Sequence, residues 1–132
     1  MGDETAHRRP ARSMLMTMVL GLVSACAGET PDRPPVGGAD PARGLTVIRA
    51  AGCAACHQIP GVSWPEGAVG PPLEGFGDRS LIAGRLPNQP EPLAAFIRNA
   101  PAFVPDGGMP PMPITEQEAR DAAAYLLSLE PR

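Results

Sequence analysis

The apolar positions of the chain recur at helical spacing in three separate stretches. In the first, residues 41–51, the apolar and small residues fall near one face: Gly44, Val47, Ile48 and Ala51. Asp40 stands before this stretch as a good N-cap, and Pro41 suits the first helical position, which needs no backbone N–H. The pattern therefore predicts a helix that begins at residue 41.

The second stretch, residues 90–99, turns one apolar side inward through Leu93, Phe96 and Ile97. The third begins after a capping box of Thr115 and Glu118, and its apolar residues again share a face: Ala119, Ala122, Ala123, Leu126 and Leu129. No stretch reads convincingly as a strand. We therefore expect an all-α domain of three to four short helices.

The composition indicates that this domain needs help to form a core. The 132 residues include 18 Pro and 15 Gly but only five aromatic side chains. Small domains bury a smaller share of their surface than large ones, so few bulky side chains leave a thin core. A large apolar cofactor would supply the missing contacts.

The first 25 residues have the pattern of an export signal. Arg8, Arg9 and Arg12 precede an apolar run at residues 14–23, which is too short to span a membrane as a helix. The sequence VSAC that ends at Cys26 resembles the lipobox of bacterial lipoproteins, in which this cysteine becomes the lipid-modified first residue. Ordinary signal cleavage at Ala-Cys-Ala, which would leave a soluble periplasmic protein, is the alternative.

Residues 26–39 contain Pro, Gly and charged residues without apolar periodicity, and we expect a flexible linker there. This leaves residues 40–132 as the folded domain. From residue 26 onward the sequence has 12 acidic residues and eight arginines, a net charge of −4, and no lysine. The chain therefore lacks the basic face that a nucleic-acid-binding protein needs.

The motif with the clearest chemistry is Cys53-Ala54-Ala55-Cys56-His57. The spacing C-x-x-C-H is typical of covalent haem attachment. Two thiols three positions apart on a helical turn can reach two vinyl groups on one porphyrin edge and form thioethers. The next residue then presents a neutral imidazole to the iron. We therefore expect one haem c on Cys53 and Cys56, with His57 as an axial iron ligand.

Three other interpretations of the motif compete. A redox dithiol would sit near a βαβ pattern, which this chain lacks. A zinc site would need more ligands than Cys26 and His7, the only other cysteine and histidine, both near the N-terminus. A structural disulfide leaves the adjacent His57 unexplained.

Around this motif, residues 40–129 resemble a class I cytochrome c domain. The resemblance implies that Pro71, in Gly70-Pro71-Pro72-Leu73, accepts a hydrogen bond from the axial imidazole through its carbonyl. It also implies that Arg79 lies close to a haem propionate, although a solvated surface arginine is the alternative. The lysine-ringed docking surface of mitochondrial cytochrome c is ruled out by the composition.

The sixth iron ligand is expected to be a methionine. Beyond the signal the sequence has only Met109 and Met112, both in GGMPPMP. The family pattern places Met-Pro about six residues before the cap of the last helix. This spacing favours Met109, with Met112 as the alternative ligand. A thioether is a soft donor that favours the reduced iron and raises the reduction potential.

These residues predict a periplasmic, membrane-tethered electron carrier rather than an enzyme, because two axial ligands leave the iron no position for a small-molecule substrate. Details such as Ile59–Val62 resemble cytochrome domains that work with terminal oxidases. A periplasmic dehydrogenase or a quinol-oxidising complex is an equal alternative as partner. A five-coordinate haem protein that binds or senses a gas is the alternative function.

Overall fold

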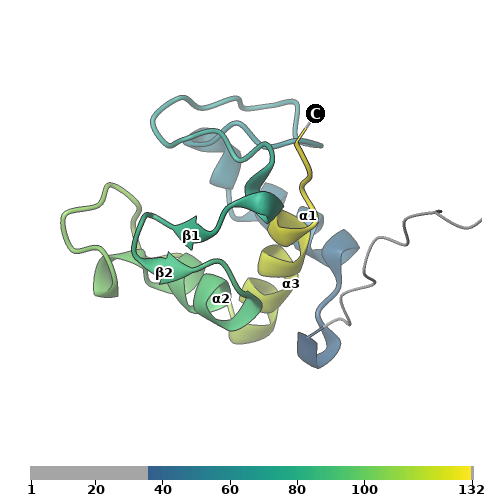
Figure 1. Ribbon diagram of the computed structural model, residues 1–132. Coiled ribbons are helices and arrows are strands. Elements are labelled where there is room, and N and C mark those ends of the chain that lie inside the picture. The colour runs from purple at the N-terminus through teal and green to yellow at the C-terminus, as the bar shows by residue number, and fades with distance from the viewer. Residues whose placement is uncertain (1–35, 132) are drawn as a thin grey trace, which may run out of the picture. The chain divides into compact units, whose positions relative to one another are not determined.

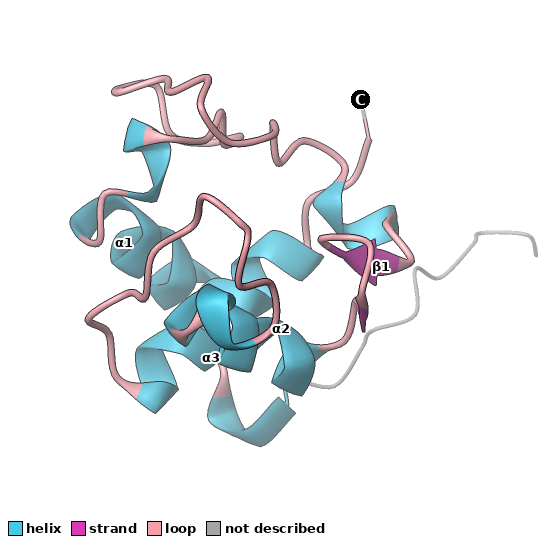
Figure 2. Cartoon of the chain, turned by 90° about the vertical axis from the view of Figure 1, so that its left-hand side faces the viewer, coloured by secondary structure: helices cyan, strands magenta, loops and turns pink. Residues whose placement is uncertain are grey.

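The computed structural model describes residues 36–131, so the expected signal peptide, Cys26 and most of the linker lie outside the described residues. Within residues 36–131 the chain is built from helices and loops, with strand confined to one small hairpin (Figure 2). Residues Val36–Gly38 form a single 3-10 turn, and Ala39 is already buried.

The three predicted helices are present. Helix α1 covers Pro41–Ala50, α2 covers Pro90–Arg98 and α3 covers Glu116–Leu127. Asp40 caps α1 by accepting hydrogen bonds from the backbone of Ala42 and Arg43. The expected capping box between Thr115 and Glu118 begins α3. The all-α prediction is therefore confirmed, and side-chain caps mark the starts of α1 and α3.

Helix α3 packs against both α1 and α2 (Figure 1). Its crossing with α1 is close because Gly44 has no side chain: a Cβ there would overlap the carbonyl of Asp121 and the Cβ of Tyr125. Ile48 and three alanines of α3, Ala119, Ala122 and Ala123, are almost fully buried around this contact. Small residues thus let two helix backbones approach where larger ones would hold them apart.

Shorter elements connect the helices. Three-residue 3-10 turns occur at Cys53–Ala55, Phe76–Asp78 and Ala100–Ala102. An antiparallel hairpin that was not predicted joins β1, Leu81–Ile82, to β2, Leu86–Pro87. Its strands have two residues each, which is too short to show an alternating pattern.

None of the helices in residues 36–131 is long and apolar enough to cross a membrane.

Candidate functional site

A cavity of about 680 Å³ lies among the helices, the hairpin and the loops that join them. Its walls are mostly apolar, with contributions from α1, α2 and α3. The buried lining residues are Ile48, Ile59, Leu73, Phe76, Ile82, Leu93, Ile97, Ala100, Ala122 and Leu126. A space of this size and lining suits a large apolar ligand.

The segment that carries the two thiols forms one wall of the cavity. Gly52 adopts a left-handed conformation, φ +71°, directly after α1, and this lets the chain turn into Cys53–Ala55. Backbone N–H groups of Cys56 and His57 both donate to the carbonyl of Cys53, at 3.2 and 3.1 Å. Cys53, Cys56 and His57 therefore line the same cavity on one short turn.

Both cysteines are free thiols. Cys56 is exposed and Cys53 is half-buried, and burial raises the pKa of the Cys53 thiol. The disulfide that competes with haem attachment is not formed here. Among residues 36–131 there is also no cluster of three or more His, Cys, Asp or Glu side chains that could hold a metal ion, so the described chain offers no zinc site of the common kind.

The imidazole of His57 is oriented by the backbone of the next loop. Its Nδ1 lies 2.8 Å from the carbonyl oxygen of Pro71. Because a carbonyl oxygen can only accept, Nδ1 must carry the hydrogen. In the neutral ring, Nε2 then keeps its lone pair, which is the arrangement an iron ligand needs.

Two glycines bring this loop close to the attachment segment. A Cβ on Gly70 would overlap the ring of His57, and one on Gly67 would overlap the backbone of Ala55. The same glycines donate backbone hydrogen bonds: Gly67 to the carbonyl of Ala54 and Gly70 to that of Cys56, both at 2.8 Å. The loop is thus fastened against the turn that carries the thiols and the imidazole.

Both candidate methionines line the cavity. Met109 is half-buried and packs against the hydrophobic core. The backbone N–H of Met112 donates to the carbonyl of Arg98 at 3.0 Å, which ties the Gly107–Pro113 loop to the end of α2. The structure brings both thioethers to the cavity that His57 lines, and the choice of Met109 over Met112 stays a prediction.

Arg79 also lines the cavity, directly after the turn Phe76–Asp78. Its Nη2 donates to the carbonyl oxygens of Pro72 at 2.6 Å and Glu74 at 3.4 Å. Its guanidinium carbon lies 5.2 Å from the centre of the Phe76 ring. A cation therefore stands at the wall of an apolar cavity and holds the residue next to Pro71.

Sequence reasoning missed part of the lining. The hairpin contributes Ile82, Ala83 and Gly84, and the loop after α2 contributes Val104. Ala83 adopts a positive φ of 48°, which is uncommon for a residue other than glycine. The neighbouring Gly84 was the one local signal of a turn at this point.

The residues present fit a haem. The cavity offers two thiols and an imidazole on one wall, two thioethers in its lining, an arginine for an acidic group and otherwise apolar side chains. This donor set matches the covalent and axial bonds of a c-type haem, and the remaining aliphatic lining would suit the apolar faces of its ring.

Comparisons with known proteins agree with this site. Residues 41–130 match the family model described as cytochrome c. Cytochrome c oxidase subunit 2 of Alkalihalophilus pseudofirmus is 35% identical over 89 residues, which are 67% of this chain and 25% of that protein. The chain thus spans about a quarter of the length of this relative.

Two solved structures share the fold. The structure of SoxXA from P. pantotrophus matches with a TM-score of 0.55 and 25% identity, over 74% of this chain and 88% of that one. Cytochrome c2 from Rhodobacter sphaeroides matches with a TM-score of 0.52 and 17% identity, over 71% and 98% of the two chains. By its family match, its class I fold and its haem-attachment motif, this chain belongs to the cytochrome c family, whose members carry covalent haem c and transfer electrons.

Proposed function

We propose that this protein is a mono-haem electron carrier held at the periplasmic side of a bacterial membrane. Cys53 and Cys56 bind one haem c through thioethers, and His57 and Met109 are its axial ligands. The observation that carries the proposal is the imidazole of His57, fixed by the Pro71 carbonyl at 2.8 Å in a cavity that methionine side chains also line.

The haem supplies a one-electron couple, and the chain determines how easily that couple is reduced. The carbonyl of Pro71 raises the electron-donating character of the imidazole by accepting a hydrogen bond from Nδ1–H of His57. A methionine thioether favours reduced iron, and apolar walls favour the state of lower charge. Arg79 lines the same cavity, and its guanidinium would pair with a haem propionate.

Two neutral axial ligands leave no open coordination position, so the protein passes single electrons and does not turn over a substrate. The similarity to an oxidase subunit 2 supports a terminal oxidase as electron acceptor. A dehydrogenase or a quinol-oxidising complex is the alternative partner. Lipidation of Cys26 would keep the domain close to such membrane complexes, and the Pro-rich linker would let it move between them.

The ligand assignment is tested by the absorption spectrum of protein matured with the cytochrome c assembly machinery. We expect one haem per chain, retained in acidified organic solvent, and a weak far-red band in the oxidised form. Met109→Ala should abolish this band and Met112→Ala should retain it. The opposite result would make Met112 the ligand. Ready carbon monoxide binding by the reduced wild type would instead favour the gas-binding alternative.

The anchor is tested separately by cell fractionation. The wild type should fractionate with membranes, and Cys26→Ser should release it to the soluble periplasmic fraction. Unchanged fractionation of Cys26→Ser would refute lipidation at this residue.

A further inference from the structure

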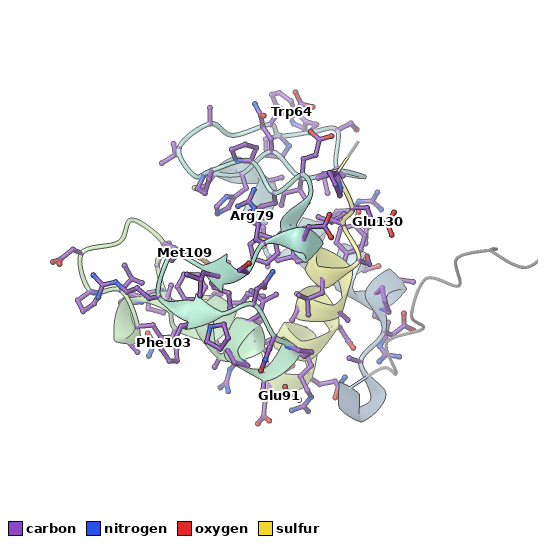
Figure 3. The ribbon with its side chains drawn as sticks, in the orientation of Figure 1. Trp64, Arg79, Glu91, Phe103, Met109 and Glu130 are labelled. Atoms are coloured by element: carbon purple, nitrogen blue, oxygen red, sulfur yellow. The ribbon has the colours of Figure 1, made fainter. Side chains whose placement is uncertain are left out.

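Trp64, the single tryptophan of the sequence, is 85% exposed. It stands on the loop that follows the haem-attachment motif and points away from the body of the molecule (Figure 3). It does not line the cavity, so a haem bound there would not cover it. Tryptophan is among the residues most enriched where proteins bind one another, because its large ring adds apolar contact at little entropic cost.

The loop that presents Trp64 is held at both ends. Before it, Ile59 and Val62 form an antiparallel bridge, and Arg49 donates to the carbonyl of Gly61 at 2.6 Å. After it, Gly67 and Gly70 donate to the carbonyls of Ala54 and Cys56, both at 2.8 Å. Trp64 is therefore fixed relative to the haem-attachment turn, and binding through it needs little ordering of the loop.

The stretch of sequence that carries Trp64 is acidic. Residues 58–78 contain three acidic residues, Glu66, Glu74 and Asp78, and no arginine or lysine, and all three acidic side chains are exposed. Glu66, two positions after Trp64, takes part in no ion pair among residues 36–131. The nearest cations by sequence are Arg49 and Arg79, which donate to the carbonyls of Gly61 and Pro72 and keep their charge. The three acidic residues outnumber these two arginines, so the loop and its flanks keep a net negative charge.

We propose that Trp64 anchors a protein electron-transfer partner whose contact face has an apolar pocket surrounded by basic side chains. The indole fills the pocket, and Glu66 lies opposite the basic rim. This inference rests on the proposed function. The loop is hydrogen-bonded to Ala54 and Cys56, so a partner that binds Trp64 would lie beside the haem-attachment turn. Opposite charges attract over long distances and orient the two proteins before contact.

A membrane surface is the less favoured occupant. Anionic lipid headgroups attract basic segments. In contrast, Glu66 is the only charged residue at positions 58–73, and the chain from residue 26 onward has a net negative charge. A second copy of the chain would meet the same acidic charge around its own Trp64.

The test uses isotopically labelled, haem-loaded and reduced protein titrated with unlabelled mitochondrial cytochrome c at low ionic strength. This probe supplies the basic rim that the proposal requires, because an exposed face of it is ringed by lysines. The single indole N–H gives one resonance, which reports on Trp64 alone. We expect this resonance and the amides of residues 62–70 to shift on binding. Trp64→Ala should weaken binding at least about tenfold, as hot-spot truncations do.

A matched pair of charge variants separates local attraction from net charge. Glu66→Gln and Glu91→Gln make the same change, but Glu91 lies at the end of the molecule away from Trp64 (Figure 3). Glu66→Gln should weaken binding about two- to fivefold and reduce its dependence on salt, in line with a charge at an interface. Equal effects of the two variants would overturn the local role of Glu66.

The proposal is overturned if the wild type does not bind the probe, if the shifts lie elsewhere, or if Trp64→Ala binds as the wild type does. It is also overturned if the indole resonance responds to the protein's own concentration or to phosphatidylcholine–phosphatidylglycerol vesicles instead. Failure of the proposed function is recognised independently, because the spectrum of the unmixed protein would then lack a covalently bound, six-coordinate haem.

Discussion

Arg43 and Asp121 form a two-point ion pair across the crossing of α1 and α3, with Nε donating to Oδ2 at 2.9 Å and Nη2 to Oδ1 at 3.0 Å. The carboxylate is 3% exposed and also accepts from the backbone of Asp40 at 2.8 Å and from Gln117 at 3.0 Å. One buried acid thus fastens the start of the domain to its last helix.

Asp121→Asn should destabilise the haem-loaded protein by about 1.5–3 kcal/mol, since hydrogen bonds to a charged group are lost at a buried site. The shift is measured as the midpoint of guanidinium unfolding. Glu116→Gln is the matched control on the same helix: its partner is Arg120, but Glu116 is 69% exposed, and such pairs contribute little. Equal destabilisation by both variants would contradict the role given to Asp121.

Stability should fall as the pH is lowered below about 5. The Arg43 hydrogen bond holds the pKa of Asp121 below its ordinary value, and the backbone N–H of Thr115 lowers the pKa of Glu118. Each carboxyl binds protons more weakly in the folded state, so its contribution is complete above the unfolded pKa of about 4 and is lost as the pH falls through the folded pKa.

Denaturant unfolding at a series of pH values checks this dependence. Asp121→Asn should lose less stability than the wild type between neutral and acidic pH. This variant lacks one of the two carboxyls whose pKa is lowered by folding. Parallel curves for the two proteins would contradict the assignment.

Gly44→Ala should cost about 1–3 kcal/mol, because the new methyl group would overlap the backbone of Asp121 and separate α1 from α3. Thr46→Ala is the control on the exposed side of α1, where alanine is the better helix former. Guanidinium unfolding should show a loss for the first variant and no loss for the second. A stable Gly44→Ala protein would mean that the helix crossing can widen without cost.

Much of the fold follows from short-range rules that act within a few residues. Asp40 with Pro41, and Thr115 with Glu118, mark the starts of α1 and α3, and the structure has both caps. The C-x-x-C-H motif is equally local, since its five residues form one turn. Such features are visible in sequence because the interacting groups are neighbours along the chain.

Features that depend on distant partners could not be predicted. Asp121 follows a charged and polar stretch of sequence at residues 116–120, which gives no sign that it is buried. Its carboxylate is paired with Arg43, 78 residues away. The strands of the hairpin at Leu81–Pro87 are too short to show alternating apolar and polar positions. The choice between Met109 and Met112 depends on how the loop crosses the cavity, and both side chains line it.

Gly70→Ala should impair haem incorporation. A Cβ there would overlap the His57 ring and displace it from the Pro71 carbonyl, which orients the imidazole. We expect less covalent haem per chain and a weaker far-red band in the fraction that matures. Ala68→Ser adds one atom at an exposed position of the same loop and should leave both unchanged. Normal haem content in Gly70→Ala would show that the ring can move without losing its ligand geometry.

Arg79→Gln should lower the midpoint potential of the haem. Arg79 places a cation at the cavity, and a nearby positive charge disfavours the oxidised iron, which carries one more positive charge than the reduced form. Arg79→Lys keeps the charge but loses the guanidinium fork, whose Nη2 holds the Pro72 carbonyl at 2.6 Å.

Redox titration of the two variants therefore separates the effect of the charge from that of the hydrogen bond. If the potential falls further in Arg79→Gln than in Arg79→Lys, the effect comes from the charge. Equal falls in the two variants would assign the effect to the hydrogen bond that holds the Pro72 carbonyl. A potential unchanged in both variants would contradict any influence of Arg79 on the haem.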